Sequence, residues 1–201
     1  MYRRTTLPVV VSVFLGAGAL ANPGLAQDDS NALFPNTRDH GSAVVEHEDD
    51  ALQAVVAYNY SQRHHDSRWL LIQLAMTASS HMRIDREDIF LRDPDGREIP
   101  LPPHEVYRQD RRRVVTLRQN SSLMRHDILS YINRPAESSP FRFLVEPGHG
   151  IRDRFFEVDR WRVAWGDLYF ASPTDAWDAG TYSLVINGED GTQAVLPIKL
   201  H

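Results

Sequence analysis

The segment that decides the fold reads RWLLIQLAMTA and runs from Arg68 to Ala78. Neighbouring side chains of a strand point to opposite faces of the sheet, and apolar residues fill nearly all positions of both faces here. A strand that is apolar on both faces belongs in the middle of a sheet, where both faces are covered. The sequence therefore predicts a central, buried strand over residues 68–78.

A second strand is expected directly before this one. Residues 52–60 are rich in valine, alanine and tyrosine, which favour strands. Residues 61–67 between the two runs are polar and predict a turn. The two strands should therefore pair antiparallel as a hairpin.

A tight turn is predicted at Asp93-Pro94-Asp95-Gly96. Proline presets the backbone of the first central turn position, and Asp-Gly suits the turn's exit. Short apolar runs flank this turn on both sides, so it should join two short strands. Prolines at positions 100, 102 and 103 confine the second strand to a sheet edge or end it.

The strand pattern is interrupted between about residues 105 and 133. Ser121 and Ser122 can cap a helix that ends at Asn133, with an apolar face formed by Met124, Ile128, Tyr131 and Ile132. Residues 106–117 fit either a strand or a helix, and both alternatives stay open. We expect a helical insertion between strands.

The strand pattern then resumes and continues to the C-terminus. Short strands are expected over residues 141–145, 155–158, 161–170, 181–186 and 193–200. Seven or more short strands at such spacing are typical of an antiparallel sandwich. The predicted fold class is mainly β, with one sandwich domain over residues 51–201.

The run Asp178-Ala179-Gly180-Thr181-Tyr182 and the strand after it resemble the tyrosine corner of immunoglobulin-like and fibronectin-like sandwiches. The resemblance implies structural roles for Asp178, Gly180 and Tyr182, with the Tyr182 hydroxyl bonded to nearby backbone. The chain departs from true immunoglobulin domains in lacking both cysteines and in carrying the helical insertion. Because this fold group hosts many functions, the resemblance implies an immunoglobulin-like sandwich and no particular activity.

The N-terminal segment resembles a secretory signal peptide. Arg3 and Arg4 precede the apolar run Leu7–Leu20, and small residues lead to a predicted cleavage after Ala26. We expect residues 1–26 to be removed and the protein to be exported to the periplasm or beyond. Residues 27–50 are polar and acidic and are expected to form a flexible linker.

Charge and composition restrict the function classes. The chain has no cysteine, which excludes disulfides and thiolate metal sites. It carries 22 basic and 27 acidic side chains, and loss of Arg3 and Arg4 would change the formal charge from −5 to −7. A negative chain argues against a nucleic-acid binder.

The strongest positive feature is a cluster of arginines around the insertion. Such a cluster could bind a phosphate headgroup, an anionic polysaccharide or an acidic protein face. A solvated helix face is the alternative. The candidate binding residues are Arg108, Arg111, Arg112, Arg113 and Arg118, with Arg125 close by.

Trp161, Trp165 and Tyr169 are evenly spaced, so a regular strand places them on one face. If that face is open, the rings could stack on sugar rings as in a carbohydrate-binding module. If it faces inward, they belong to the core.

Two histidines and a carboxylate, His64, His65 and Asp66, fall in the predicted turn. These side chains could hold zinc or copper, whereas solvated loop histidines are the alternative. No Gly-x-Ser-x-Gly motif and no phosphate-binding glycine loop occurs in the sequence. We therefore expect no cofactor.

The sequence favours an exported, non-catalytic binding or accessory module of the bacterial envelope. Its expected partner is an envelope protein or an anionic ligand, with no membrane span after signal cleavage. The alternatives are a metal-dependent hydrolase that uses the His64–His65 region and a carbohydrate-binding module that uses the three aromatic residues.

Overall fold

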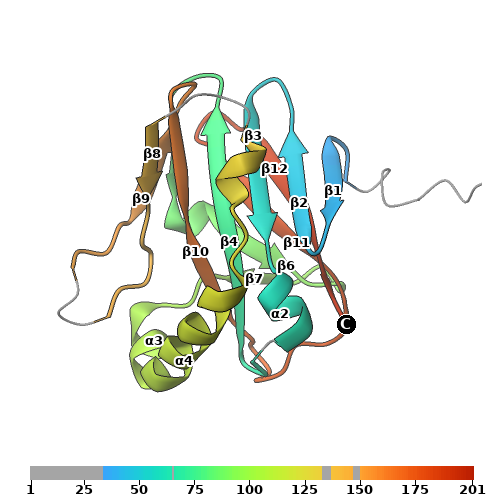
Figure 1. Ribbon diagram of the computed structural model, residues 1–201, viewed down its shortest axis with the longest axis vertical. Helices are drawn as coiled ribbons and strands as arrows, with labels where there is room; N and C mark the ends of the chain where they lie inside the picture. Colours follow the sequence, from blue (N-terminus) through green and yellow to red (C-terminus); the bar gives the residue numbers. More distant parts are fainter. Residues whose placement is uncertain (1–33, 65, 133–136, 147–149) are drawn as a thin grey trace, which may run out of the picture.

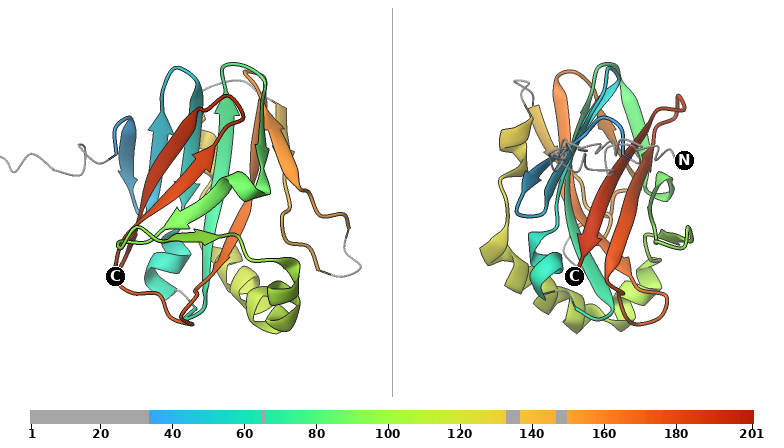
Figure 2. Two further views of the ribbon diagram at one scale, coloured as in Figure 1. Left: turned by 180° about the vertical axis from the view of Figure 1, so that it is seen from behind. Right: turned by 90° about the vertical axis from the view of Figure 1, so that its right-hand side faces the viewer.

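The protein is a β-sandwich with a helical layer on one side. The computed structural model describes residues 34–64, 66–132, 137–146 and 150–201. Figures 1 and 2 show a six-stranded sheet between a smaller sheet and the helical insertion, which comprises the four helical segments α3, α4, η2 and η3. The mainly β fold with a helical insertion between strands, predicted from the sequence, is therefore confirmed.

The larger sheet has the order β1-β2-β3-β4-β10-β8. All of its neighbouring strands are antiparallel except β8 and β10, which are parallel. Its strands are β1 (Thr37–Gly41), β2 (Val44–Glu48), β3 (Leu52–Ala57), β4 (Trp69–Ala78), β10 (Arg162–Ala171) and β8 (Glu137–Pro140).

The second sheet is antiparallel and has the order β12-β11-β6-β7. A separate antiparallel pair joins β5 to β9. The bounds of these strands are Gln193–Leu200 for β12, Gly180–Asn187 for β11, Ile89–Arg92 for β6, Glu98–Pro100 for β7, Met82–Asp85 for β5 and Phe155–Val158 for β9.

The helical segments lie mainly between β7 and β8. The short helix α2 (Asn59–His64) joins β3 to β4, and the 3₁₀ turn η1 (Arg86–Asp88) precedes β6. The helical insertion consists of α3 (His104–Gln109), α4 (Arg111–Ser121), η2 (Ser122–Met124) and η3 (Ile128–Tyr131). No helix in the described part of the chain has the length and apolar character needed to cross a membrane.

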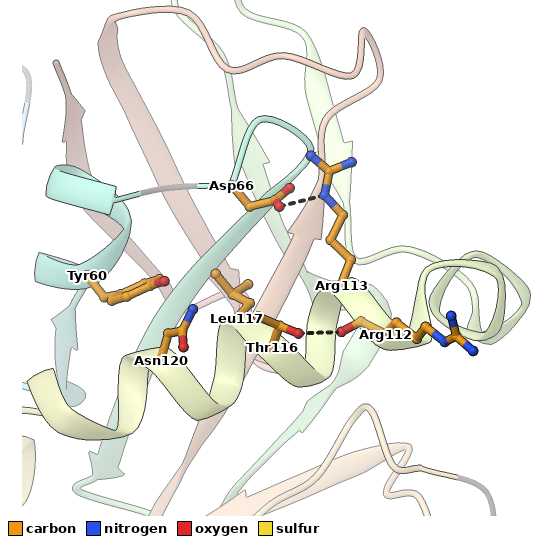
Figure 3. Close-up of a pocket in the computed structure, with 7 residues that line it drawn as sticks. All are labelled: Tyr60, Asp66, Arg112, Arg113, Thr116, Leu117 and Asn120. Carbon is orange, nitrogen blue, oxygen red and sulfur yellow. Dashed lines mark hydrogen bonds and ion pairs between the residues drawn. The ribbon is translucent and has the colours of Figure 1, made fainter.

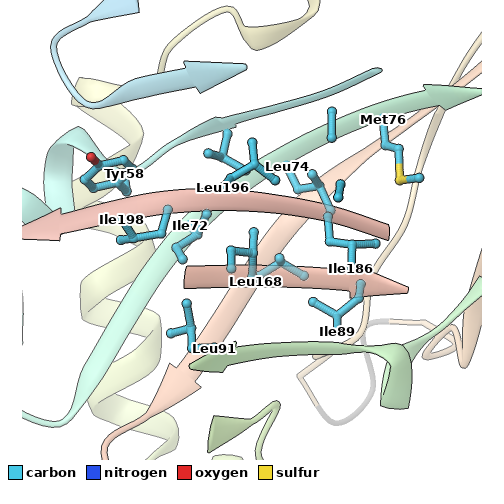
Figure 4. Packing of buried hydrophobic residues seen from close by; sticks show 14 of the residues in the cluster. Tyr58, Ile72, Leu74, Met76, Ile89, Leu91, Leu168, Ile186, Leu196 and Ile198 are labelled. Atoms are coloured by element: carbon cyan, nitrogen blue, oxygen red, sulfur yellow. The ribbon is translucent and has the colours of Figure 1, made fainter. Parts of the chain in front are cut away.

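Strand β4 lies at the centre of the larger sheet, as its sequence predicts. All ten of its residues are buried, and it pairs with β3 on one side and β10 on the other. Its inward side chains Ile72, Leu74 and Met76 join the main core between the sheets (Figure 4). Burial of such apolar surface is the main stabilising contribution to a fold of this kind.

The outward face of β4 is buried by the helical insertion. Trp69 and Leu71 pack with Tyr107 of α3 and with Val114 and Leu117 of α4. In a second outer cluster, Ile128 of η3 and Ile132 just after it pack on the same face of the sheet, against residues of β2, β3, β4 and β10. The central strand is therefore apolar on both faces because it serves two cores.

The other hairpins agree with the sequence. Strands β6 and β7 pair across the Asp93–Gly96 turn, where the Asp93 carboxylate accepts hydrogen bonds from the backbone N–H groups of Asp95 (3.0 Å) and Arg97 (2.8 Å). Strands β11 and β12 pair along their full length. The predicted antiparallel pairing of β3 with β4 is confirmed, but α2 joins them where a simple turn was expected over residues 61–67.

One alternative left open around the insertion is resolved, and one prediction there is wrong. Residues 111–121 form helix α4, whereas the helix expected after Ser121 is replaced by the 3₁₀ turns η2 and η3. The Ser121 and Ser122 hydroxyls donate to the carbonyls of Arg118 (2.9 Å) and Gln119 (2.6 Å). These serines therefore close α4 and do not cap a following helix.

The strand expected over residues 141–145 is also absent. Phe141 bonds through its N–H to the Trp165 carbonyl (2.9 Å), and Arg142 then bonds to Asp153 instead of to a strand. Phe141 and Phe143 are nevertheless buried in the main core. The alternating pattern thus predicted correctly which side chains are buried. The strand in this part of the chain is β8, which ends just before Phe141.

The flexible linker predicted over residues 27–50 is wrong for residues 37–48, which form β1 and β2. The acidic Glu46 is buried there and accepts hydrogen bonds from Gln53 (2.5 Å) and His40 (2.6 Å). Paired in this way, an acidic side chain can lie inside a sheet. The predicted signal peptide, residues 1–26, and the start of the linker lie outside the described residues.

The Tyr182 hydroxyl donates a hydrogen bond to the Asp178 carbonyl at 3.2 Å. Gly180 between them has φ +155°, and a Cβ there would lie 3.0 Å from Pro94 Cγ. The local contact predicted for a tyrosine corner is therefore present. The immunoglobulin-like topology stays a prediction.

Candidate functional site

Most arginines of the predicted cluster fasten the insertion to the sandwich. Glu146 bridges two of them, since its carboxylate lies 3.2 Å from Arg111 and 2.6 Å from Arg118. Arg125 pairs with Asp167 of β10. Ion pairs that face solvent contribute only ~0.2–1 kcal/mol each, so their main effect here is to fix positions.

The predicted metal residue Asp66 meets the predicted binding residue Arg113. Asp66 lies 2.5 Å from the Arg113 guanidinium, and it also accepts bonds from the backbone N–H groups of Arg68 (2.9 Å) and Trp69 (3.0 Å). Burial acts to raise the pKa of Asp66, but these hydrogen bonds and the Arg113 charge lower it on balance. Its carboxylate is thus committed to holding α4 against the turn before β4.

Figure 3 shows the shallow hollow around this pair, with a volume of about 460 Å³. Arg112 directs its guanidinium away from the hollow, and Arg113 is neutralised by Asp66. The hollow therefore offers no free positive charge to a ligand. Its lining consists of Tyr60, Asp66, Arg112, Arg113, Thr116, Leu117 and Asn120.

The predicted metal site lies only partly within the residues that the structure describes. His64 ends α2, and His65 lies outside the described residues. Within the described ranges, no group of three or more histidine, aspartate or glutamate side chains has an arrangement that could hold a metal ion.

A second depression brings together arginines and aromatic rings from both predicted clusters. We call it the arginine–aromatic groove, and it has a volume of about 470 Å³. This volume lies within the range of ~300–1,000 Å³ that is usual for small-molecule sites. Its lining residues are Arg118, Arg125, Pro140, Phe141, Arg142, Leu144, Trp165, Gly166, Asp167 and Tyr169.

Three segments distant in sequence build this groove. Strand β10 contributes Trp165, Asp167 and Tyr169, which alternate along the strand and so point to the face opposite the main core. The end of α4 and the turn after η2 contribute Arg118 and Arg125. Pro140 at the end of β8 and the segment after it contribute the remaining wall.

The groove carries excess positive charge. Its lining holds three arginines and one aspartate, a formal charge of +2 in a chain whose total is −5. Arg118 and Arg125 are partly neutralised by Glu146 and Asp167. Among the described residues, Arg142 has no ion pair, and its backbone N–H bonds to Asp153 at 2.7 Å.

Tyr169 lies at the wall of the groove and is only 5% exposed. Its hydroxyl lies 3.5 Å from the Asp167 carboxylate. Burial, together with the Asp167 charge, raises the pKa of Tyr169 well above its usual range. The phenol therefore stays neutral and remains a hydrogen-bond donor.

The three residues of the predicted aromatic trio lie in three different environments. Trp165 is half-buried and packs beside the outer cluster under η3, while Tyr169 joins the cluster under α4. Trp161 precedes β10, is 61% exposed, and has the Arg160 guanidinium 4.9 Å from its ring. The shared face is thus neither open nor part of the main core, because the insertion partly covers it.

Arg108 and Arg112 are exposed and have no ion pair within the part of the chain that the structure describes. Neither lines the groove. Sequence reasoning missed Arg142 and Asp167 as site residues. A signal for Arg142 exists, because the alternation Phe141-Arg142-Phe143 indicates that the arginine points away from the core that both rings enter.

No protein-family model, curated protein or solved structure matches this chain.

Proposed function

We propose that this chain is an exported, non-catalytic binding module, and that the arginine–aromatic groove holds an anionic ligand. The observation that carries the proposal is the convergence on one depression of Arg118 and Arg125 from the helical insertion and Arg142 from the segment after β8. Guanidinium groups bind carboxylate and phosphate oxygens through paired hydrogen bonds. The signal-like N-terminal segment supports export.

The charge of the groove favours an anion over a neutral ligand. Its positive charge opposes that of the whole chain, so it is a local feature of the site. Arg118 forms an ion pair with Glu146, and Arg125 forms one with Asp167. Arg142 has no such partner among the described residues. An incoming anion would find Arg142 ready to pair.

The titratable groups of the groove favour binding over catalysis. Asp167 is paired with Arg125, and the Tyr169 phenol is kept neutral by burial. A neutral phenol does not act as a general base, and the Asp167 carboxylate is engaged by the Arg125 guanidinium. Arginine remains charged at all ordinary pH values.

Isothermal titration calorimetry with three polyanions of different backbone tests the proposal. The probes are octaglutamate, tripolyphosphate and an oligouronide, each at low ionic strength because salt screens such contacts. We expect at least one probe to bind, and Arg142→Glu to weaken that binding at least tenfold. Arg108→Glu, an exposed arginine outside the groove, is the matched control and should leave the affinity within about twofold.

The proposal fails if none of the three probes binds. It also fails if Arg142→Glu and Arg108→Glu weaken binding equally, since the charge of the whole surface would then be responsible. Circular dichroism of each variant separates a lost contact from a lost fold.

A further inference from the structure

Positive charge alone does not account for the composition of the groove. A site for a bare phosphate needs only donors and cations. This groove also contains Trp165, which is half-buried, and its walls include Leu144 and Phe141. A ligand that fits the whole groove must present an apolar face as well as a negative group.

We propose that the ligand is a carboxylated sugar, a uronic acid unit within a polysaccharide; this inference rests on the proposed function. A pyranose ring presents axial C–H groups on one face, and aromatic side chains pack against such faces in many binding sites. Its carboxylate is a planar anion that matches a guanidinium. One acidic sugar therefore uses both kinds of side chain that the groove offers.

Each polar group of the groove then has a role. The indole of Trp165 receives the sugar ring, and the guanidinium of Arg142 pairs with the carboxylate. The Asp167 carboxylate, held by Arg125, accepts hydrogen bonds from sugar hydroxyls. Arg118, held by Glu146, adds a second positive charge at the α4 side.

Other anions use the groove less completely. A phosphate chain offers no face to the indole, and an acidic peptide offers flexible carboxylates that lose conformational entropy on binding. A neutral sugar would remove water from the arginines without pairing their charges, and this loss of solvation would weaken its binding. The acidic sugar is the ligand class that satisfies the ring and the charge together.

Calorimetry with short saccharides tests this inference. The acidic probes are the trimers of galacturonate, glucuronate and mannuronate, and galactotriose is the neutral probe. We expect at least one acidic trimer to bind at least tenfold more tightly than galactotriose, and to change the tryptophan fluorescence. Trp165→Ala and Arg142→Gln should each weaken that binding at least tenfold.

Matched controls come from the same chain. Trp161→Ala removes an exposed tryptophan outside the groove, and Arg108→Gln removes an exposed arginine outside it. Both should leave the affinity within about twofold. If Trp165→Ala does not fold, Trp165→Phe keeps an aromatic ring and should retain partial affinity, while Arg142→Gln alone tests the charge.

The outcomes separate this inference from the proposed function. Binding of tripolyphosphate or octaglutamate through Arg142, without binding of any acidic trimer, overturns the inference and leaves the proposed function standing. Equal binding of galactotriose and the acidic trimers also overturns it, because the carboxylate would then contribute nothing. If no probe of either experiment binds, both proposals fall.

Discussion

At residue scale, Gly166 shows how one position shapes both the core and the groove. A Cβ at this site would lie 2.6 Å from both a ring carbon and the carbonyl oxygen of Phe141. Real Cβ contacts are never so short, so only glycine lets the segment after β8 lie against β10. That close approach lets Phe141 enter the core while Arg142 reaches the groove.

Gly166→Ala should therefore destabilise the protein by about 1–3 kcal/mol, the usual cost of overpacking a core. Urea unfolding followed by circular dichroism measures this change. Thr181→Ala, at an exposed position of β11, is the control and should stay within about 0.5 kcal/mol of the wild type. Equal values for the two variants would mean that the Phe141 segment moves aside without cost.

Asp66 should contribute to the pH dependence of the free energy of unfolding. Hydrogen bonds from Arg113 and two backbone amides lower the pKa of this carboxyl below its ordinary 3.8, against the effect of burial. A lowered folded-state pKa stabilises the fold above pH 3.8, and this contribution is lost as the pH falls through the folded-state value.

Asp66→Asn should accordingly be less stable than the wild type at pH 7, and the difference should shrink as the pH falls below 3.8. Denaturant unfolding at a series of pH values measures it. Asp50→Asn, at an exposed position, is the control. A difference that stays constant from pH 7 to pH 2.5 would contradict the ionic contribution of Asp66.

At element scale, the sequence predicted strands best where local signals and burial agree. Strand β4, the β6–β7 turn and the β11–β12 pair were all expected, because alternation, proline and glycine act locally. Residues 37–48 were missed as strands because the buried Glu46 is tolerated only through its partners His40 and Gln53, which meet it when the strands pair. The parallel strand β8 has the sequence Glu-Ser-Ser-Pro, which carries no apolar signal, and β10 alone holds it in the sheet.

The attachment of α4 depends on Glu146, which lies 35 and 28 residues from the two arginines that it bridges. Glu146→Gln should weaken both contacts by about 1 kcal/mol in total, which corresponds to about fivefold faster hydrogen exchange in α4. Amides of β4 should exchange at unchanged rates. Glu105→Gln in α3 is the control, and equal acceleration in both variants would remove Glu146 from this role.

At the scale of the whole molecule, the residues of the groove could be predicted as candidates, but not that they come together in one place. The arginines and the tryptophans were each candidates from the sequence. Their convergence depends on β10 pairing with β4, which turns Trp165 toward the insertion, and on the ion pair that draws Arg125 to Asp167. Neither contact has a local signature, so residue patterns alone could not join the two clusters.

The main core should unfold as one unit. Leu74→Ala removes a fully buried side chain from β4 and should cost about 2–5 kcal/mol. Leu123→Ala removes a leucine that is 91% exposed and should change the free energy of unfolding by less than about 0.5 kcal/mol. Urea titrations followed by tryptophan fluorescence and by circular dichroism should give coincident transitions, and separate midpoints would show independent unfolding of the insertion.

The pairing of β4 with β10 also sets the order of events when the chain is made. Trp69 pairs with Ala171, 102 residues further on. At the usual synthesis rate of about 5–20 residues per second, β10 is completed about 5–20 s after the start of β4. Until then, the edge of β4 that pairs with β10 has no partner strand. During that interval a ten-residue apolar strand presents unpaired N–H and C=O groups, which are a template for aggregation. Production of this protein should therefore depend on a chaperone that shields β4 until residue 171 has emerged.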